Sequence, residues 1–219
     1  MNYQCLILDH DDTVVNSTAS VHYPPFVESL RVLRPNVHLT LDDYFLFNFD
    51  PGFSEYCENV LHFTKEEAAA QEKEWCDYVA THVPKAYDGM RELLTRFQKE
   101  GGHICVVSHS LKENILRDYR ENDLPTPEIV FGWELSPNKR KPAPWPLQEI
   151  MRELSLKPEQ LLMVDDLKPG KVMADACGVP FAAAGWAHQV DKIVRYMKSE
   201  CQFYLPTVND LYKLVFDEK

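Results

Sequence analysis

The sequence lacks the features that mark membrane-spanning, disulfide-rich and zinc-binding proteins. None of its apolar runs approaches the length that spans a bilayer, and no signal peptide precedes the first predicted strand. Its six cysteines include no pair at the spacing of a zinc knuckle or a redox motif, and Cys5 and Cys105 lie in apolar runs typical of buried strands. We therefore expect a cytoplasmic protein with reduced thiols and no membrane partner.

Basic residues are also scarce. Lys and Arg number 23 against 34 Asp and Glu, which gives a formal net charge of -11. The only basic triplet is at residues 139–141. Such a chain repels the phosphate backbone, so we expect no nucleic-acid partner. The hydrophobic content of 45% and the charged content of 26% are typical of a folded globular protein.

Short apolar runs alternate with amphipathic helical patterns over most of the 219 residues. This alternation is typical of βαβ units around a parallel sheet and predicts an α/β fold with a Rossmann-like three-layer core. Glycines at 101–102 and 178 are expected to end two of the helices. Six runs predict strands: Tyr3–Leu8, His103–Val107, Glu128–Phe131, Leu161–Val164, Val179–Ala183 and Phe203–Leu205.

Residues 16–84 interrupt this alternation. They show helical patterns and aromatic residues but no convincing strand, and Thr64 and Glu67 have the spacing of a capping box that opens a helix toward Val83. We interpret this stretch as a helical insert within a core formed by residues 1–15 and 85–219.

Carboxylate and hydroxyl side chains follow three of the predicted strands. Asp9 and Asp11 follow the first strand, Ser108 follows the second, and Asp165 and Asp166 follow the fourth. Each signal alone is more typical of a turn or a helix cap. Because ligands bind at the carboxyl ends of parallel strands, the joint arrival of these groups at one edge predicts a functional site.

Electrostatics indicates what this site would bind. Carboxylates packed together raise one another's pKa, and a cation relieves that repulsion. A site made of oxygen ligands suits Mg²⁺ better than zinc. Lys141 lies before a helix and adds a positive charge. An anionic group such as phosphate would then be held by the metal, Lys141, Ser108 and loop amides.

At these positions the sequence resembles the haloacid dehalogenase-like superfamily, in its phosphoglycolate phosphatase and β-phosphoglucomutase branch. Residues 9–13, DHDDT, are similar to the first family motif, DxDGT, and Ser108 stands where the second has Ser or Thr. Residues 140–144, RKPAP, and 165–170, DDLKPG, are similar to the third and fourth motifs. The resemblance covers nearly the whole chain, and four motifs in the family's order make it specific.

The resemblance implies a magnesium-dependent phosphatase that acts on a small phosphorylated metabolite, with residues 16–84 as a helical cap over the site. Asp9 would attack phosphorus and form an aspartyl-phosphate. Asp11 would protonate the leaving oxygen and then deprotonate the attacking water. Ser108 and Lys141 would bind the transferring phosphoryl group.

The resemblance also implies a set of metal ligands. Mg²⁺ would be held by the Asp9 carboxylate, the Asp11 backbone carbonyl and the Asp166 carboxylate, with Asp165 either supporting these groups or joining them. Dehalogenases and phosphonatases of the superfamily lack a carboxylate at the position of Asp11, so its presence favours phosphate-ester chemistry.

Three residues near the first and fourth motifs lead to further expectations. Asp12 replaces the usual Gly, and because Asp adopts left-handed backbone angles more easily than most residues, we expect a shifted loop. Leu167 replaces the usual Ser, and this loss of a hydroxyl is expected to weaken support for the metal ligands. Strand alternation directs His10 away from its neighbours, although its loop position leaves a substrate contact open.

Two other functions fit the same pattern. A phosphomutase of the β-phosphoglucomutase type would use Asp9 and Asp11 but return the phosphoryl group to a sugar. A catalytically silent binding module would keep the fold alone, and the intact Asp9, Asp11, Lys141 and Asp166 argue against it. The identity of the substrate and the oligomeric state are left open by the sequence.

Overall fold

The computed structural model describes residues 1–217 and divides into two compact units. Unit 1 consists of Met1–Asn16 and Lys85–Lys219, and unit 2 is the continuous segment Ser17–Pro84. In the described part of the chain, no helix is long and apolar enough to cross a membrane.

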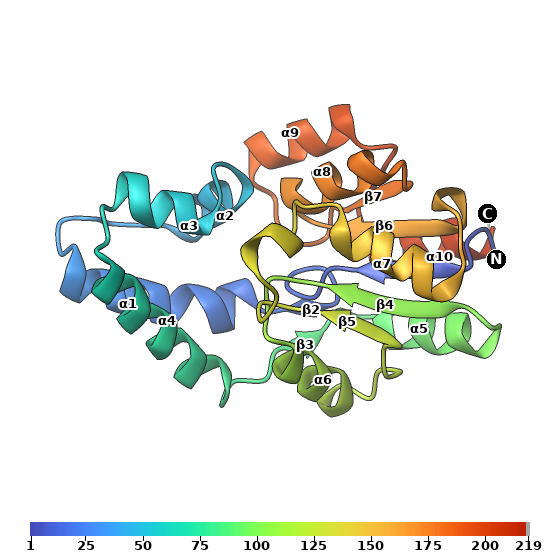
Figure 1. Cartoon of the computed structure of the whole chain (residues 1–219), viewed down its shortest axis with the longest axis horizontal. Coiled ribbons are helices and arrows are strands. Elements are labelled where there is room, and N and C mark those ends of the chain that lie inside the picture. The colour runs from blue at the N-terminus through green and yellow to red at the C-terminus, as the bar shows by residue number, and fades with distance from the viewer. Residues whose placement is uncertain (218–219) are drawn as a thin grey trace. The chain divides into compact units, whose positions relative to one another are not determined.

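Unit 1 is built on a parallel sheet of six strands in the order β5-β4-β1-β6-β7-β8 (Figure 1). The sequence predicts all six, with ends that differ from the structure by at most two residues, and it predicts β4 and β8 with their observed ends. The strands are β1 (Cys5–Leu8), β4 (His103–Val107), β5 (Ile129–Phe131), β6 (Leu161–Asp165), β7 (Phe181–Ala184) and β8 (Phe203–Leu205).

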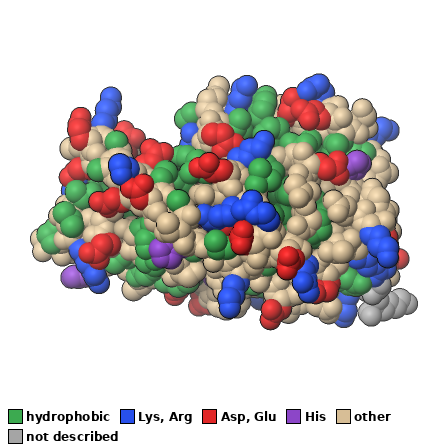
Figure 2. Space-filling view, turned by 90° about the horizontal axis from the view of Figure 1, so that it is seen from below, with side chains coloured by type: hydrophobic (Ala, Val, Ile, Leu, Met, Phe, Trp, Pro, Cys, Tyr) green, Lys and Arg blue, Asp and Glu red, His purple; other side chains and the backbone are tan. Residues whose placement is uncertain are grey.

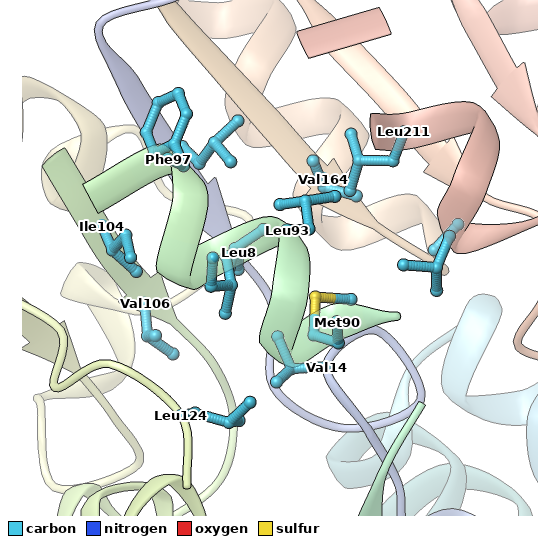
Figure 3. Close-up of a cluster of buried hydrophobic side chains, with 14 of the residues drawn as sticks. Leu8, Val14, Met90, Leu93, Phe97, Ile104, Val106, Leu124, Val164 and Leu211 are labelled. Carbon is cyan, nitrogen blue, oxygen red and sulfur yellow. The ribbon is translucent and has the colours of Figure 1, made fainter. Parts of the chain in front are cut away.

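Helices cover both faces of this sheet and complete the three layers (Figure 1). Side chains of α5, α6 and α10 pack with the strands in one large buried cluster. Figure 3 shows Leu93 and Met90 of α5 against Leu8 of β1 and Val164 of β6 in this cluster. The opposite face carries α7, α8 and α9. The bounds are α5 (Met90–Lys99), α6 (Lys112–Glu121), α7 (Trp145–Leu154), α8 (Lys168–Cys177), α9 (Asp191–Glu200) and α10 (Val208–Phe216), with 3₁₀ turns at Pro137–Lys139 and Pro158–Gln160.

A short antiparallel pair stands at the two places where the chain passes between the units. It joins β2 (Val15–Asn16) to β3 (Lys85–Ala86). The hydropathy pattern does not predict this pair, because strands of two residues are too short to show alternation.

Unit 2 is helical, as its sequence predicts. Its longest helix begins after Thr64 with the predicted capping box but ends at Val79, short of Val83. Beyond it the chain turns more tightly: the N–H of Thr81 donates to the Tyr78 carbonyl oxygen at 3.1 Å, and Nδ1 of His82 lies 2.8 Å from the same oxygen. Its core is aromatic, with Phe26 packed against other rings. The helices are α1 (Tyr23–Leu33), α2 (Leu41–Phe49), α3 (Phe53–Glu55) and α4 (Lys65–Val79), with π-helical turns at Thr18–His22 and Tyr56–Val60.

Candidate active site

Asp9 stands at the carboxyl end of the central strand. Leu8 pairs with Val106 on one side and with Val164 on the other, so Asp9 lies level with the last residues of β4 and β6. Its backbone N–H donates to the carbonyl oxygen of Val164 at 2.9 Å, and the residue is only 6% exposed. The register therefore places this carboxylate at the sheet edge where ligands bind in folds of this class.

Lys141 links this carboxylate to the end of β6. Its Nζ lies 2.8 Å from Oδ1 of Asp9 and 2.7 Å from Oδ2 of Asp165, and its side chain is buried. Nε2 of His109 lies 3.0 Å from the Lys141 carbonyl oxygen and donates to it, since a carbonyl can only accept. Burial lowers the pKa of His109 to about 4, so its ring is neutral at pH 7.

The protonation of the site depends on burial and on its neighbours. Burial opposes the charge of Lys141, but the carboxylates of Asp165 and Asp9 outweigh it and raise the pKa of the ammonium group. Burial raises the pKa of Asp165 to about 7 against the attraction of Lys141. Burial and then the nearby Asp165, Asp12 and Asp9 raise the pKa of Asp166 well above its usual value. The single positive charge of Lys141 therefore does not balance the several carboxyl groups buried beside it.

These acidic groups are arranged as a cation would need them. Asp9, Asp165 and Asp166 are all buried, and each offers an oxygen within 4.8 Å of the others. Both oxygens of Asp165 are engaged, because Oδ1 accepts from the Leu167 N–H at 2.8 Å and Oδ2 from Lys141. Hard oxygen donors in this number fit Mg²⁺, with Asp9 and Asp166 as the better placed ligands.

A glycine allows the first turn of α8 to approach Asp165. A Cβ on Gly170 would lie 2.2 Å from Oδ2 of Asp165, the oxygen that Lys141 contacts. Any side chain there would displace the carboxylate. Leu167 lacks the hydroxyl of the usual Ser, but its backbone N–H still donates to Asp165. Any residue except proline can make this contact, so replacing Ser does not remove it.

The loop after β1 closes tightly through its backbone. Asp12 has a φ of 56°, which is the left-handed conformation expected for it, and its N–H donates to the Val15 carbonyl at 2.7 Å. His10 points away from the site, as strand alternation predicts: its Nε2 lies 3.0 Å from Oδ2 of Asp118, and it is 1% exposed.

Asp11 and Ser108 form a second group, joined by a residue that the motifs do not single out. Oγ of Ser110 lies 2.6 Å from Oδ2 of Asp11 and donates to it. The N–H of Ser110 donates to Oγ of Ser108 at 3.2 Å. Position alone gives a weak signal for Ser110, two residues beyond Ser108 in the same loop.

His188 is a further residue beside the carboxylates that sequence reasoning misses. Its Nε2 lies 3.7 Å from Oδ2 of Asp166, and both side chains are buried. It lies in the loop after β7, outside the four motifs, so no sequence signal marks it.

Comparison with known proteins extends the resemblance beyond the motifs. Residues 6–184 match the haloacid dehalogenase-like hydrolase family model. Among curated relatives, pyrophosphatase PpaX of Bacillus thuringiensis (strain Al Hakam) is 21% identical over 217 residues, which are 99% of this chain and 98% of the relative.

Solved structures share the fold. A haloacid dehalogenase-like family hydrolase from Streptococcus pneumoniae superposes with a TM-score of 0.76 at 14% identity, covering 99% of both chains. CbbY from Rhodobacter sphaeroides in complex with phosphate gives a TM-score of 0.74 at 16% identity, covering 95% of this chain and 96% of that one.

Proposed function

Because this chain belongs to the haloacid dehalogenase-like hydrolase family, we propose that it is a magnesium-dependent phosphatase that hydrolyses a small-molecule phosphate monoester through an aspartyl-phosphate intermediate. The observation that carries this proposal is the buried Asp9 carboxylate held 2.8 Å from the Lys141 ammonium, beside two further buried carboxylates. The name of the relative PpaX and the phosphate bound to CbbY support phosphate as the group acted on.

In the first step, one oxygen of Asp9 forms a bond to phosphorus while the bond from phosphorus to the ester oxygen breaks. Asp11 gives its proton to the leaving oxygen. Lys141 stays protonated next to Asp9, so it offsets the negative charge of the transferring group, and Ser108 donates to a phosphoryl oxygen.

In the second step, water attacks the phosphorus of the aspartyl-phosphate. Asp11, now a carboxylate, takes a proton from this water, and the bond between phosphorus and Asp9 breaks. Inorganic phosphate leaves, and Asp9 and Asp11 return to their starting states. The same carboxyl group thus serves as acid and then as base.

Mg²⁺ would be held by the carboxylates of Asp9 and Asp166 and the backbone carbonyl of Asp11, and when bound it neutralises charge on the phosphoryl oxygens. Asp165 supports Lys141 through Oδ2, while its Oδ1 accepts from the N–H of Leu167. Residues 1–15 and 85–219 act as the catalytic core, and residues 16–84 as the cap that selects the substrate and excludes water.

We place this enzyme in the cytoplasm with a small phosphorylated metabolite as its partner. All six cysteines are free thiols, which fits a reducing compartment.

The proposal is tested by hydrolysis of p-nitrophenyl phosphate with Mg²⁺ and with EDTA, by wild type and by Asp9→Asn. We expect activity that requires Mg²⁺ and that the variant loses. Undiminished activity in Asp9→Asn would sink the mechanism. Absence of turnover on a wide panel of phosphate esters would favour the silent binding module, and transfer of phosphate to a sugar would favour the mutase.

A further inference from the structure

We propose that Ser110 is a positioning residue for Asp11, so that its hydroxyl fixes the carboxyl group that moves the proton to the leaving oxygen. This inference rests on the proposed function. Ser110 is 4% exposed, and its Oγ donates to Oδ2 of Asp11 at 2.6 Å. A hydrogen bond to a carboxylate is stronger than one between neutral groups, so this contact restricts the orientation of the acid.

The loop after β4 holds Ser110 from several sides. Its N–H donates to Oγ of Ser108, and its carbonyl oxygen accepts from the N–H of Trp133 at 2.9 Å. That carbonyl also lies where a Cβ on Gly132 would come within 2.6 Å of it, so the backbones are in close contact. A serine fixed in this way presents its hydroxyl from a rigid position.

The chemistry of a hydroxyl suits both roles of Asp11. A serine hydroxyl donates to an ionised carboxylate and also accepts from a protonated one. The bond to Ser110 is therefore available before and after the proton leaves Asp11. Since Ser108 is assigned to the phosphoryl group, the path from Ser108 through Ser110 fixes the acid relative to the bond that breaks.

Leaving-group dependence separates this role from a structural one. A basic leaving oxygen needs its proton more than an acidic one, so a misplaced acid harms poor leaving groups selectively. We would measure kcat/KM, which covers the steps up to the aspartyl-phosphate, on p-nitrophenyl phosphate and on 4-methylphenyl phosphate. These esters are similar in size, and the phenol of the second has a pKa near that of tyrosine, about 10.

For Ser110→Ala we expect kcat/KM to fall about 10-fold or more on 4-methylphenyl phosphate and less than about 3-fold on p-nitrophenyl phosphate, as a part of the ~10²–10⁴-fold that acid–base catalysis supplies. Ser110→Thr keeps the hydroxyl and should restore most of this loss. Adding Ser110→Ala to Asp11→Asn should cost nothing further, because the group to be positioned is already gone. The control is Ser136→Ala, which removes an exposed hydroxyl from another loop, where it donates to the side chain of Asn138 at 2.8 Å.

Equal losses on both esters, or the same loss in the Asp11→Asn background, would overturn the inference while leaving the phosphatase intact. Faster turnover of 4-methylphenyl phosphate by Ser110→Ala would also overturn it. Wild type that turns over neither ester in Mg²⁺ would overturn the proposed function, and the role of Ser110 with it.

Discussion

The two units of the molecule bury different kinds of side chain. The core of unit 2 is made of aromatic rings, among them Phe47 stacked on Tyr56 with centroids 4.3 Å apart. Its ion pairs lie toward the surface, as between Lys73 and Asp77, whose side chains are 75% and 68% exposed. On the face shown in Figure 2, positively and negatively charged side chains lie interspersed at the surface.

Unit 1 instead buries charge at one edge of its sheet. The side chains of Lys141, Asp9 and Asp165 are 4%, 9% and 1% exposed. Buried ions cost free energy unless they are paired, so hydrophobic residues of similar volume would stabilise such a place as well or better. Burial in unit 2 is thus of the kind that stabilises a fold, whereas we attribute the buried charges of unit 1 to the proposed phosphatase chemistry.

The largest effect should come from removing the buried lysine of the site. Lys141→Met keeps most of the volume but leaves Asp9 and Asp165 buried without their partner. We expect kcat on a phosphate ester to fall by about 10²–10³-fold or more. In EDTA the free energy of unfolding should fall by about 3–5 kcal/mol, measured in urea.

The matched control for this change is Lys171→Met in the same unit. Lys171 pairs with Asp175, whose side chain is 59% exposed, so its partner keeps its contact with water when the lysine is lost. We expect near-normal turnover. Equal losses in the two variants would contradict a special role for Lys141 and the contrast between a lysine with buried partners and a lysine with an exposed one.

A second prediction concerns the close approach of α8. Gly170→Ala adds a Cβ that would overlap with the carboxylate of Asp165, so either this carboxylate or the first turn of α8 must shift and the contact with Lys141 is disturbed. We expect the affinity for Mg²⁺, measured calorimetrically, to fall about 10-fold or more, as for other changes in groups that support metal ligands. Turnover should fall with it.

Gly101→Ala serves as the control. At Gly101 an added Cβ meets nothing within 4 Å, but the φ of 90° is strained for alanine. This variant should lose about 1–3 kcal/mol of stability and keep its affinity for Mg²⁺. A normal metal affinity in Gly170→Ala would show that Asp165 does not need its present position.

The third prediction concerns how the free energy of unfolding changes with pH, and the direction of this change differs between the two units. Burial raises the pKa of Asp165 to about 7 from an unfolded value of 3.8, so the folded protein binds more protons than the unfolded chain between these values. Without metal, the free energy of unfolding should therefore rise as the pH falls from about 8 to about 6.5. Saturating Mg²⁺ needs deprotonated ligands, so its stabilising effect should grow as the pH rises.

Two other groups limit the pH range in which this trend can be measured and compared. The pKa of His109 is lowered to about 4 from an unfolded value of 6.5, so the protonation of this residue in the unfolded chain, half complete at pH 6.5, favours unfolding increasingly below that pH and obscures the effect. In unit 2, the hydrogen bond from Arg34 lowers the pKa of Glu67 to about 2, and the stability it contributes is lost only below its unfolded value of 4.5. Urea unfolding at a series of pH values, in EDTA and in Mg²⁺, measures the pH dependence of stability without metal and that of the stabilisation by Mg²⁺. Stability in EDTA that rises from pH 6.5 to 8 would contradict the assignment.

Much of this contrast follows from the sequence. The predicted family is confirmed, as are the hydrolase class and the parallel sheet. Apolar runs mark the buried strands, and the polar groups that end each strand come next in the chain, so the order of residues alone predicts that Asp9, Asp165 and Asp166 lie together. Their roles, like that of Lys141, stay predictions that the experiments on these residues would test.

The remaining features depend on geometry between distant residues. Ser110 and Asp11 are 99 residues apart, and only the path of two loops shows that they form a hydrogen bond. His188 reaches Asp166 from a loop with no motif. The importance of Gly170 lies in the space that it leaves, which a residue type alone does not show.

The smallest effects are expected in unit 2. Arg34 donates to the carbonyl oxygens of Leu61 and His62 at 2.7 and 2.8 Å and pairs with Glu67 at 2.8 Å, so it joins the end of α1 to the start of α4. Arg34→Met should lower Tm by a few degrees, since these carbonyls lose their donor. The affinity for Mg²⁺ should not change, because the carboxylates that would hold the metal belong to unit 1.

Lys73→Ala is the matched control for Arg34→Met, because it removes a pair that is exposed on both sides. Exposed pairs contribute little, so Tm should shift by less than about 1 °C in a thermal melt. A loss equal to that of Arg34→Met would mean that the carbonyl contacts of Arg34 add nothing. A change in Mg²⁺ affinity in either variant would contradict the proposed separation, in which the charges of unit 2 support folding and the buried charges of unit 1 support catalysis.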